Sequence, residues 1–289
     1  MNPEELLWPA PAKLNLMLRV IGRRDDGYHQ LQTVFQFPEQ SDHLRFRVRG
    51  ESQIRCATLL PGVEEERNLA VLAARALRDY CGTRQGVSIE IHKALPMGGG
   101  LGGGSSNAAT TLLLLNRLWG CNLDIEQLSA IGLQLGADVP LFIQGRSVWA
   151  EGVGELFTPF QPKELWYLVV HPPDQVSTAE IFADPELTRD AEPIKIRDFL
   201  AGRDENTLEP LVRKRFVAVD EAIQWLNGFT RGRLTGTGSC VFGEFETRER
   251  AEAALANLPE QMAGFVSRGL NLSPLHRRMQ VFDGAWPSG

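Results

Sequence analysis

The sequence predicts an α+β protein built from two domains, and three observations support this class. The chain has 289 residues, which exceeds one typical domain of roughly 100 to 200 residues. Its first half opens with a hairpin pattern and continues with helices, whereas its second half has the order strand, helix, strand, strand, helix, strand. Two prolines in four residues, Pro159-Phe160-Gln161-Pro162, interrupt the periodicity between the halves. We therefore expect domains at residues 1–160 and 161–289.

Composition and charge exclude several classes of protein. Hydrophobic residues make up 43% of the chain and charged residues 23%, which excludes a disordered chain, a collagen and a coiled coil. Because the net charge is -6 and no long run of Lys or Arg occurs, we expect no nucleic-acid partner. The acidic N-terminus and the short apolar runs predict a cytoplasmic protein with no membrane partner. We expect a monomer or a weak homodimer.

The four cysteines predict neither a zinc site nor a redox pair. They are widely scattered, at Cys56, Cys81, Cys121 and Cys240, without a C-x-x-C motif or an adjacent histidine. We expect four reduced and mostly buried thiols.

The first half begins with a β-hairpin. From Lys13 to Val20 apolar residues alternate with others, which predicts a half-buried strand. Asp26-Gly27 supplies the turn and Tyr28–Phe37 the second strand. Further strands are expected over residues 44–48 and 86–92. Helical spacing predicts helices over Asn68–Tyr80, Ser105–Trp119 and Ile125–Leu135, the last with Gly136 as its C-cap, and a fourth short element begins at Asp138-Val139-Pro140.

The second half predicts a ferredoxin-like domain. Strands are expected over residues 165–171, 233–235, 240–245 and 264–270. Ser177-Thr178-Ala179-Glu180 has the spacing of a capping box that opens a short helix. A long amphipathic helix is expected over Leu208–Asn227, and another over Arg248–Leu258 behind Thr247. The resulting order of elements is that of a split β-α-β unit.

A dense glycine run predicts an anion site. Six of the 28 glycines lie between Gly98 and Gly104, after a strand and at the start of a helix. Glycines let several backbone N–H groups converge on a ligand, and the following helix adds the positive end of its dipole. Ser105 or Ser106 could offer a hydroxyl to phosphate or Mg²⁺. A flexible linker is disfavoured, because a strong helix follows at once.

Three common phosphate loops do not fit this run. Gly98, Gly100 and Gly103 satisfy G-x-G-x-x-G, but the next helix leads into another helix where a dinucleotide fold needs a strand. No lysine follows the last glycine, which excludes a Walker A loop, and no H-R-D or D-F-G motif occurs. A less common architecture for phosphate transfer is left.

Several residues outside the run could act on a substrate. Asp138 could accept a proton; its position favours an N-cap role at the next element, and the two roles are compatible with each other. Lys13 is the candidate cation, with a solvated edge-strand lysine as the alternative. Tyr28 and His29 could stack on and hydrogen-bond to a base. Thr235-Gly236-Thr237-Gly238-Ser239 is either a hairpin turn or a second anion nest.

Three stretches together carry a resemblance to a known family. In order and spacing they resemble the three motifs of the GHMP small-molecule kinases: Pro11-Ala12-Lys13-Leu14-Asn15-Leu16, the run from Leu95 to Ala109, and Leu234-Thr235-Gly236-Thr237-Gly238-Ser239. The stretches 26–33, 136–140 and 271–276 are similar to the branch of this family that acts on cytidine diphosphate-linked methylerythritol. The resemblance extends over nearly the whole chain.

This resemblance implies a fold and a site. The fold is an N-terminal domain like ribosomal protein S5 domain 2 with a ferredoxin-like C-terminal domain, and ATP with Mg²⁺ binds between them. The reaction is phosphorylation of the substrate's 2-hydroxyl in non-mevalonate isoprenoid synthesis. Asp138 would take the proton and Lys13 would steady the charge, while Asn15, Tyr28, His29 and Phe182 would bind the substrate. The ATP phosphates would be wrapped by Pro96, Met97, Gly98, Gly99, Gly100, Leu101, Gly102, Gly103, Gly104, Ser105 and Ser106, with Ser106 also a Mg²⁺ ligand.

Two alternatives remain at this point. A non-catalytic ATP-binding regulator would need the glycine run but neither Lys13 nor Asp138. Another GHMP kinase, such as a mevalonate or homoserine kinase, would have no base to place against Tyr28 and His29.

Overall fold

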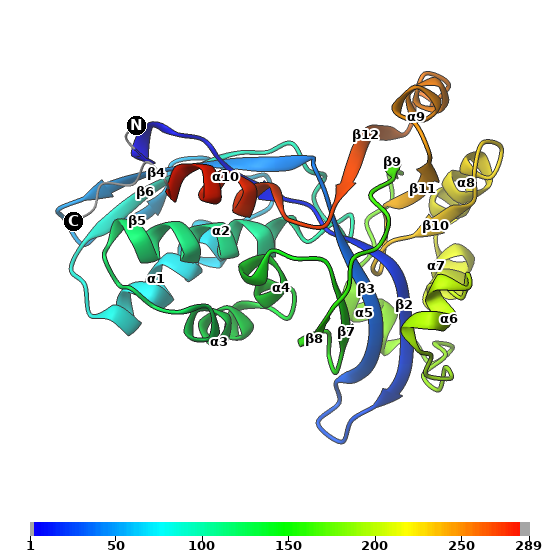
Figure 1. Ribbon diagram of the computed structural model, residues 1–289, viewed down its shortest axis with the longest axis horizontal. Coiled ribbons are helices and arrows are strands. Elements are labelled where there is room, and N and C mark those ends of the chain that lie inside the picture. The colour runs from blue at the N-terminus through cyan, green and yellow to red at the C-terminus, as the bar shows by residue number, and fades with distance from the viewer. Residues whose placement is uncertain (1–2, 284–289) are drawn as a thin grey trace.

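The first half of the chain builds a four-stranded sheet beside a group of helices (Figure 1). The computed structural model describes residues 3–283. The sheet order is β1 (Trp8–Pro11), β4 (Ser41–Arg49), β6 (Gly86–His92) and β5 (Ile54–Cys56). Its helices are α1 (Leu69–Cys81), α2 (Gly103–Leu118), α3 (Ile125–Leu135) and α4 (Val139–Gln144), with short 3-10 turns at Pro3–Glu5 and Glu65–Arg67. Their apolar faces and this sheet form the first hydrophobic core.

The helices have identifiable caps, of which the sequence predicts Asn68 and Gly136. The Asn68 side chain accepts a hydrogen bond from the Ala70 N–H at 3.0 Å, which starts α1. Asp124 and Gln127 form a capping box at α3, and Gly136 is its C-cap residue. Helix α2 begins at Gly103, two residues before its expected start, because Gly102 serves as the N-cap with φ 72°.

The second sheet contains the ferredoxin-like unit. Its four strands have the order β10 (Gly232–Leu234), β11 (Val241–Phe245), β9 (Trp166–His171) and β12 (Ala263–Leu270), all antiparallel. This is the order of a split β-α-β fold, which confirms the prediction. The accompanying helices are α5 (Thr178–Ala183), α6 (Ile196–Leu200), α7 (Glu209–Arg215), α8 (Val217–Leu226) and α9 (Arg248–Leu255). A second core lies within this unit.

A long hairpin connects the two units. Strands β2 (Leu14–Arg23) and β3 (His29–Pro38) pair antiparallel and run between the two lobes (Figure 1). β3 also pairs with β7 (Val148–Glu151), which pairs with β8 (Leu156–Pro159). On the other side, β12 pairs with β3 through Gly269↔Pro38 and Leu270↔Phe37. The ferredoxin-like unit and the hairpin therefore share one sheet.

Two expectations about the elements were wrong, and four short strands were not predicted. The helix expected over 208–227 is two helices, because Phe216 leaves helical geometry at φ -126° and ψ 100°. The first hairpin strand is buried on both faces from Leu14 to Val20, since a bulge between Asn15 and Met17 shifts its register and other segments cover its second face. Strands β1, β5, β7 and β8 are short, and the sequence pattern did not indicate them.

The cysteine prediction was also wrong. Cys81 and Cys121 form a disulfide with their Cα atoms 5.8 Å apart, whereas Cys56 and Cys240 are free. The two residues are 40 positions apart in sequence. They meet because α1 and α2 pack together and each cysteine lies at or just after the end of its helix.

The division at residue 160 stays a prediction. The last helix, α10 (Pro274–Asp283), lies after this division in the sequence but packs with the first unit. Leu275 and Met279 are buried in the first core, and the Phe282 ring lies 5.3 Å from the Trp8 ring. Between residues 3 and 283, no helix combines the length and apolar character that a membrane crossing requires.

Candidate active site

The glycine run forms a loop that passes close to two other segments. A Cβ atom at Gly100, where φ is +74°, would lie 2.8 Å from the Thr235 carbonyl oxygen. A Cβ atom at Gly102, where φ is +72°, would lie 2.9 Å from the Phe142 ring. Only glycine therefore fits at these two positions. The loop is held against the turn at residues 235–239 on one side and against α4 on the other.

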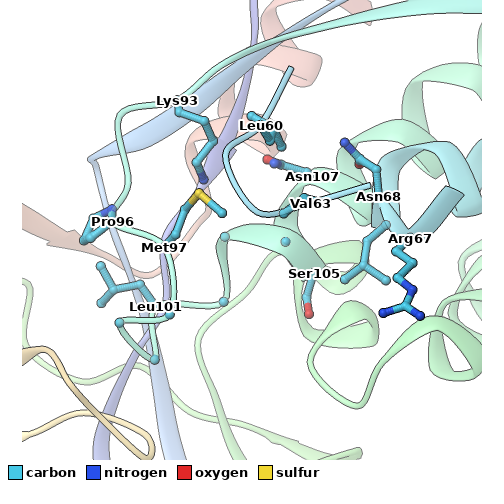
Figure 2. Close-up of a pocket in the computed structure, with 17 residues that line it drawn as sticks. Leu60, Val63, Arg67, Asn68, Lys93, Pro96, Met97, Leu101, Ser105 and Asn107 are labelled. Carbon is cyan, nitrogen blue, oxygen red and sulfur yellow. The ribbon is translucent and has the colours of Figure 1, made fainter. Parts of the chain in front are cut away.

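A cavity of about 360 Å³ lies along this loop, and we call it the loop cavity. Figure 2 shows its lining side chains, which come from the loop itself, from the end of β6 and from the segment that leads into α1. Lys93 pairs with the fully buried Asp42 at 2.5 Å, and Asp42 also accepts hydrogen bonds from the N–H groups of Ala94 and Leu95 at 2.9 Å. Asp42 thus fixes the entry to the glycine loop.

Lys13 and Asp138 meet in a second cavity of about 350 Å³, the central cavity. The Lys13 Nζ lies 3.7 Å from the Asp138 Oδ2 and donates a hydrogen bond to the Asn15 Oδ1 at 2.5 Å. The Lys13 side chain is only 6% exposed, against 36% for Asp138. The Asn15 amide donates in turn to the Thr33 Oγ1 at 2.8 Å. These contacts hold one ammonium group and one accessible carboxylate beside the glycine loop.

Asp138 stands at the N-cap position of α4, but its side chain makes no capping hydrogen bond. Its carboxylate is therefore not engaged by the helix backbone and faces Lys13 in the central cavity. The solvated edge-strand alternative for Lys13 was wrong, because the residue is 5% exposed.

The second glycine stretch is a turn between β10 and β11 that also lines the central cavity. The Gly238 N–H donates to the Thr235 carbonyl at 3.0 Å, as in a hairpin turn. The Asn15 N–H donates to the Thr235 Oγ1 at 2.9 Å, which attaches this turn to the Lys13 strand. Gly236 and Thr237 line the cavity. Its role as an anion nest stays a prediction.

Tyr28, His29 and Phe182 line a third cavity of about 430 Å³, the hairpin cavity. It lies at the tip of the β2–β3 hairpin and shares Phe182 with the central cavity. The His29 and Phe182 rings are 4.9 Å apart with their planes inclined by 31°, and Tyr28 is 63% exposed. Burial is the main cause that lowers the pKa of His29, and the positive charges of Arg189 and Arg23 lower it further. The site thus offers aromatic faces and a neutral imidazole.

The two serines after the loop differ in exposure. Ser105 lines both the loop cavity and the central cavity. Ser106 is fully buried, and its Oγ has no hydrogen-bond partner within the described part of the chain; the same holds for the Asn107 Oδ1. Within residues 3–283, no group of three or more His, Cys, Asp or Glu side chains could hold a metal ion.

Sequence reasoning missed several residues of the site. Asn68 was expected only as a helix cap, yet it lines the loop cavity together with Lys93. Asn206 donates to the carbonyls of Leu234 and Gly236 and so supports the second turn. These residues lie in no recognisable local motif. Only the three-dimensional arrangement brings them to the site.

Family models match both halves of this chain. The model of the GHMP kinases N terminal domain matches residues 68–146, and the model of the GHMP kinases C terminal domain matches residues 186–264. The chain belongs to the GHMP kinase family. It is therefore a kinase of a small molecule, with ATP as its cosubstrate.

Individual relatives indicate which branch of the GHMP kinase family this chain is most similar to. The chain is 52% identical over 281 residues to a 4-diphosphocytidyl-2-C-methyl-D-erythritol kinase of Pseudomonas savastanoi pv. phaseolicola, with 97% of this chain and 98% of the relative covered. A crystal structure of 4-(cytidine 5'-diphospho)-2C-methyl-D-erythritol kinase superposes with a TM-score of 0.79 and 32% identity, covering 91% of this chain and 99% of the other. A mevalonate kinase structure, at 16% identity and a TM-score of 0.68 over 92% and 100%, shows the shared fold. Within the family, the chain groups with the cytidylyl-methylerythritol kinases.

Proposed function

We propose that this chain transfers the γ-phosphoryl group of ATP to the 2-hydroxyl of 4-diphosphocytidyl-2-C-methyl-D-erythritol, in the non-mevalonate synthesis of isoprenoid precursors. The names of the relatives at about half identity support the substrate. The observation that carries the proposal is the Lys13–Asp138 pair in a cavity between the phosphate loop and the aromatic hairpin cavity. A phosphate donor, an acceptor hydroxyl and a base of the substrate can thus occupy neighbouring sites.

The two charged residues supply the chemistry of transfer. The acceptor hydroxyl loses its proton to a carboxylate oxygen of Asp138 as its oxygen bonds to the γ-phosphorus. The bond from the γ-phosphorus to the β–γ bridging oxygen breaks, and ADP leaves. The Lys13 ammonium, 3.7 Å from Asp138, holds that carboxylate in place and stabilises negative charge as it develops. Its burial beside the Phe35 ring strengthens this interaction.

The glycine loop and α2 bind the phosphates of ATP. Backbone N–H groups from Gly98 to Ser105 and the N-terminal end of α2 supply positive partial charge. The residues fit a Mg²⁺ ion that takes most of its ligands from phosphate, since the Ser106 Oγ lacks a partner and Ser105 borders both cavities. When bound, Mg²⁺ would neutralise phosphate charge. The sequence predicts the Ser106 hydroxyl as the protein ligand, but Ser106 is fully buried and borders neither cavity, so the Ser105 hydroxyl is the better placed of the two.

The hairpin cavity binds the cytosine end of the substrate. Tyr28 and Phe182 offer ring faces, and His29 offers a hydrogen-bonding edge. Asn15, beside Lys13, lies where the methylerythritol would meet Asp138. The diphosphate would join these two ends.

The first test replaces the two charged residues. We expect Asp138→Ala and Lys13→Ala each to lower kcat by about 10²- to 10⁴-fold, because both groups act mainly in the transition state. ATP affinity, measured by calorimetry, should stay close to that of the unmodified protein. Lys214→Ala, which removes an exposed lysine paired with Glu186, is the matched control and should keep its activity. Near-normal kcat in both site variants would contradict the assignment.

A comparison of acceptor substrates distinguishes the alternative functions. Phosphate transfer should be measured with the cytidylylated substrate, mevalonate and homoserine in parallel. The proposal requires a kcat/KM for the cytidylylated substrate far above the other two. Turnover of mevalonate or homoserine instead would show a different GHMP activity, and ATP binding without turnover of any acceptor would show a regulator.

A further inference from the structure

Arg189 connects the two sides of the hairpin cavity. It lies in the segment after α5 and is half-buried. Its Nε donates to the His29 Nε2 at 3.1 Å, which crosses from this segment to the β2–β3 hairpin. One terminal nitrogen donates to the carbonyls of Phe182 at 3.0 Å and Asp184 at 2.7 Å, and the other donates to the Leu187 carbonyl at 3.1 Å. A single guanidinium therefore holds both ring residues that face each other in the cavity.

These bonds determine where the His29 proton lies. A guanidinium is always charged and can only donate, so the Nε2 that faces it must accept. A neutral imidazole carries one N–H, which is then on Nδ1. Within residues 3–283, no side chain or backbone group hydrogen-bonds to this Nδ1. Burial and the charges of Arg189 and Arg23 lower the pKa of His29, which favours the neutral ring.

We propose that Arg189 is a positioning residue for substrate selection: it holds His29 as the Nδ1–H tautomer, so that the ring presents a fixed donor to the pyrimidine. The inference rests on the proposed function for the identity of the substrate. Cytosine carries acceptors at O2 and N3, whereas uracil carries an N–H at N3. Because uracil also accepts at O2, the fixed donor favours cytosine where it faces N3, and an imidazole free to exchange tautomers loses this preference.

The tautomer can be measured without substrate. In the free protein labelled with ¹⁵N-histidine, we expect His29 to show a protonated Nδ1 and an unprotonated Nε2 near neutral pH. Arg189→Met removes all the donors and should give a mixture of tautomers. A proton on Nε2 in the unmodified protein would overturn the proposal. Because this measurement needs no substrate, it decides the inference even if the proposed function fails.

Kinetics then separate positioning from mere support of the fold. Arg189→Met should raise KM for the cytidylylated substrate by roughly 10- to 100-fold, as for loss of a charged hydrogen bond, while KM for ATP stays within about twofold. The preference for the cytidylylated over the uridylylated substrate should fall by about tenfold. Arg189→Lys keeps the charge and one donor nitrogen and should show a smaller loss, and it is the variant to use if Arg189→Met does not fold.

The matched control is Arg215→Met. Arg215 pairs with the carboxylates of Asp184 and Glu186 in the same segment, whereas Arg189 bonds to His29 and to backbone carbonyls. It should leave the His29 tautomer, the pyrimidine preference and both KM values unchanged. If Arg215→Met alters the preference as much as Arg189→Met, Arg189 acts only by stabilising the segment and the proposal is wrong. Absence of turnover with the cytidylylated substrate in the unmodified protein would instead overturn the proposed function.

Discussion

Lys13 became a buried cation through features that local sequence does not encode. The alternation along its strand predicts one apolar face and one solvent-facing face. The pattern places four residues on the solvent-facing face: Lys13, Asn15, Met17 and Arg19. In the structure all four are buried: the glycine loop lies against Lys13, the second turn bonds to Asn15, and Arg19 contacts Glu192 and Glu205. The motif could identify Lys13 as a candidate, but its partner and its burial depend on segments more than 80 residues away.

The glycines of the loop differ in what they exclude, which gives a matched pair of variants. A Cβ at Gly102 would meet the Phe142 ring at 2.9 Å and the Lys13 Cγ at 3.1 Å, whereas a Cβ at Gly98 would meet nothing within 4 Å. Both residues have a positive φ, of +72° and +73°. We expect Gly98→Ala to cost about 1 kcal/mol of unfolding free energy through backbone strain alone.

For Gly102→Ala we expect a larger cost, about 2 to 4 kcal/mol, and a kcat lowered by at least about tenfold, because the new methyl group displaces Lys13. Urea unfolding and steady-state kinetics on the two variants provide the measurement. Equal effects of the two substitutions on kcat would show that the contact with Lys13 does not matter.

At the scale of elements, the C-terminal segment fixes the end of α4, the helix whose N-cap residue is Asp138. The His276 Nε2 lies 2.9 Å from the Ile143 carbonyl of α4, and its Nδ1 lies 2.8 Å from the Ser273 Oγ. The Ser273 N–H donates to the Gly145 carbonyl at 2.9 Å. The stretch 271–276, which the sequence marks only by its resemblance, thus has a structural explanation: it anchors the C-terminal end of α4.

Burial lowers the pKa of His276 to about 4, and the charges of Arg146 and Arg117 act in the same direction. In the unfolded chain the His276 imidazole takes up a proton near pH 6.5, whereas in the folded protein it does so only near pH 4. The contribution of neutral His276 to the unfolding free energy is therefore complete above pH 6.5 and is lost as the pH falls toward 4. Between pH 7 and pH 5 we expect the unmodified protein to lose roughly 1 to 2 kcal/mol more unfolding free energy than His276→Gln.

Urea unfolding at the two pH values measures this difference. His92→Gln is the control, since His92 is 47% exposed in its side chain and lies outside this contact. That variant should keep the pH dependence of the unmodified protein. A similar pH dependence in all three proteins would mean that His276 does not titrate in this range.

The strongly periodic elements were predictable from sequence, and the short or interrupted ones were not. Strand β6 has its predicted bounds, and Asn68, Ser177 and Thr247 are N-caps as expected, because a side chain and its own neighbours determine these features. The break at Phe216 and the three- and four-residue strands depend on tertiary contacts. The same holds for the site, where motifs indicated the phosphate loop but not Asp42, Asn206 or Arg189.

For the whole molecule, the shared sheet predicts cooperative unfolding. The ferredoxin-like unit cannot separate from the hairpin without breaking the β12–β3 pairing, and α10 attaches the following segment to the first core. We expect a single urea transition, with coincident curves from tryptophan fluorescence and far-UV circular dichroism. ATP at about 100 times its Kd should shift that one transition by about 2.7 kcal/mol. Two separate transitions, or an ATP effect on only one of them, would contradict this expectation.

The β2–β3 hairpin also fixes the distance between the central cavity and the hairpin cavity. Asn15, beside the Lys13–Asp138 pair, is opposite Phe35, and His29 of the hairpin cavity lies six residues further along the same strand. At about 3.3 Å per residue this separation is about 20 Å along the strand, and it is set by hydrogen-bonded register rather than by a mobile linker. An acceptor that occupies both places must therefore be long enough to reach from the hairpin cavity to the Asp138 carboxylate. In the proposed reaction the diphosphate would span this distance, so the number of residues in the two strands would set the length of acceptor that fits.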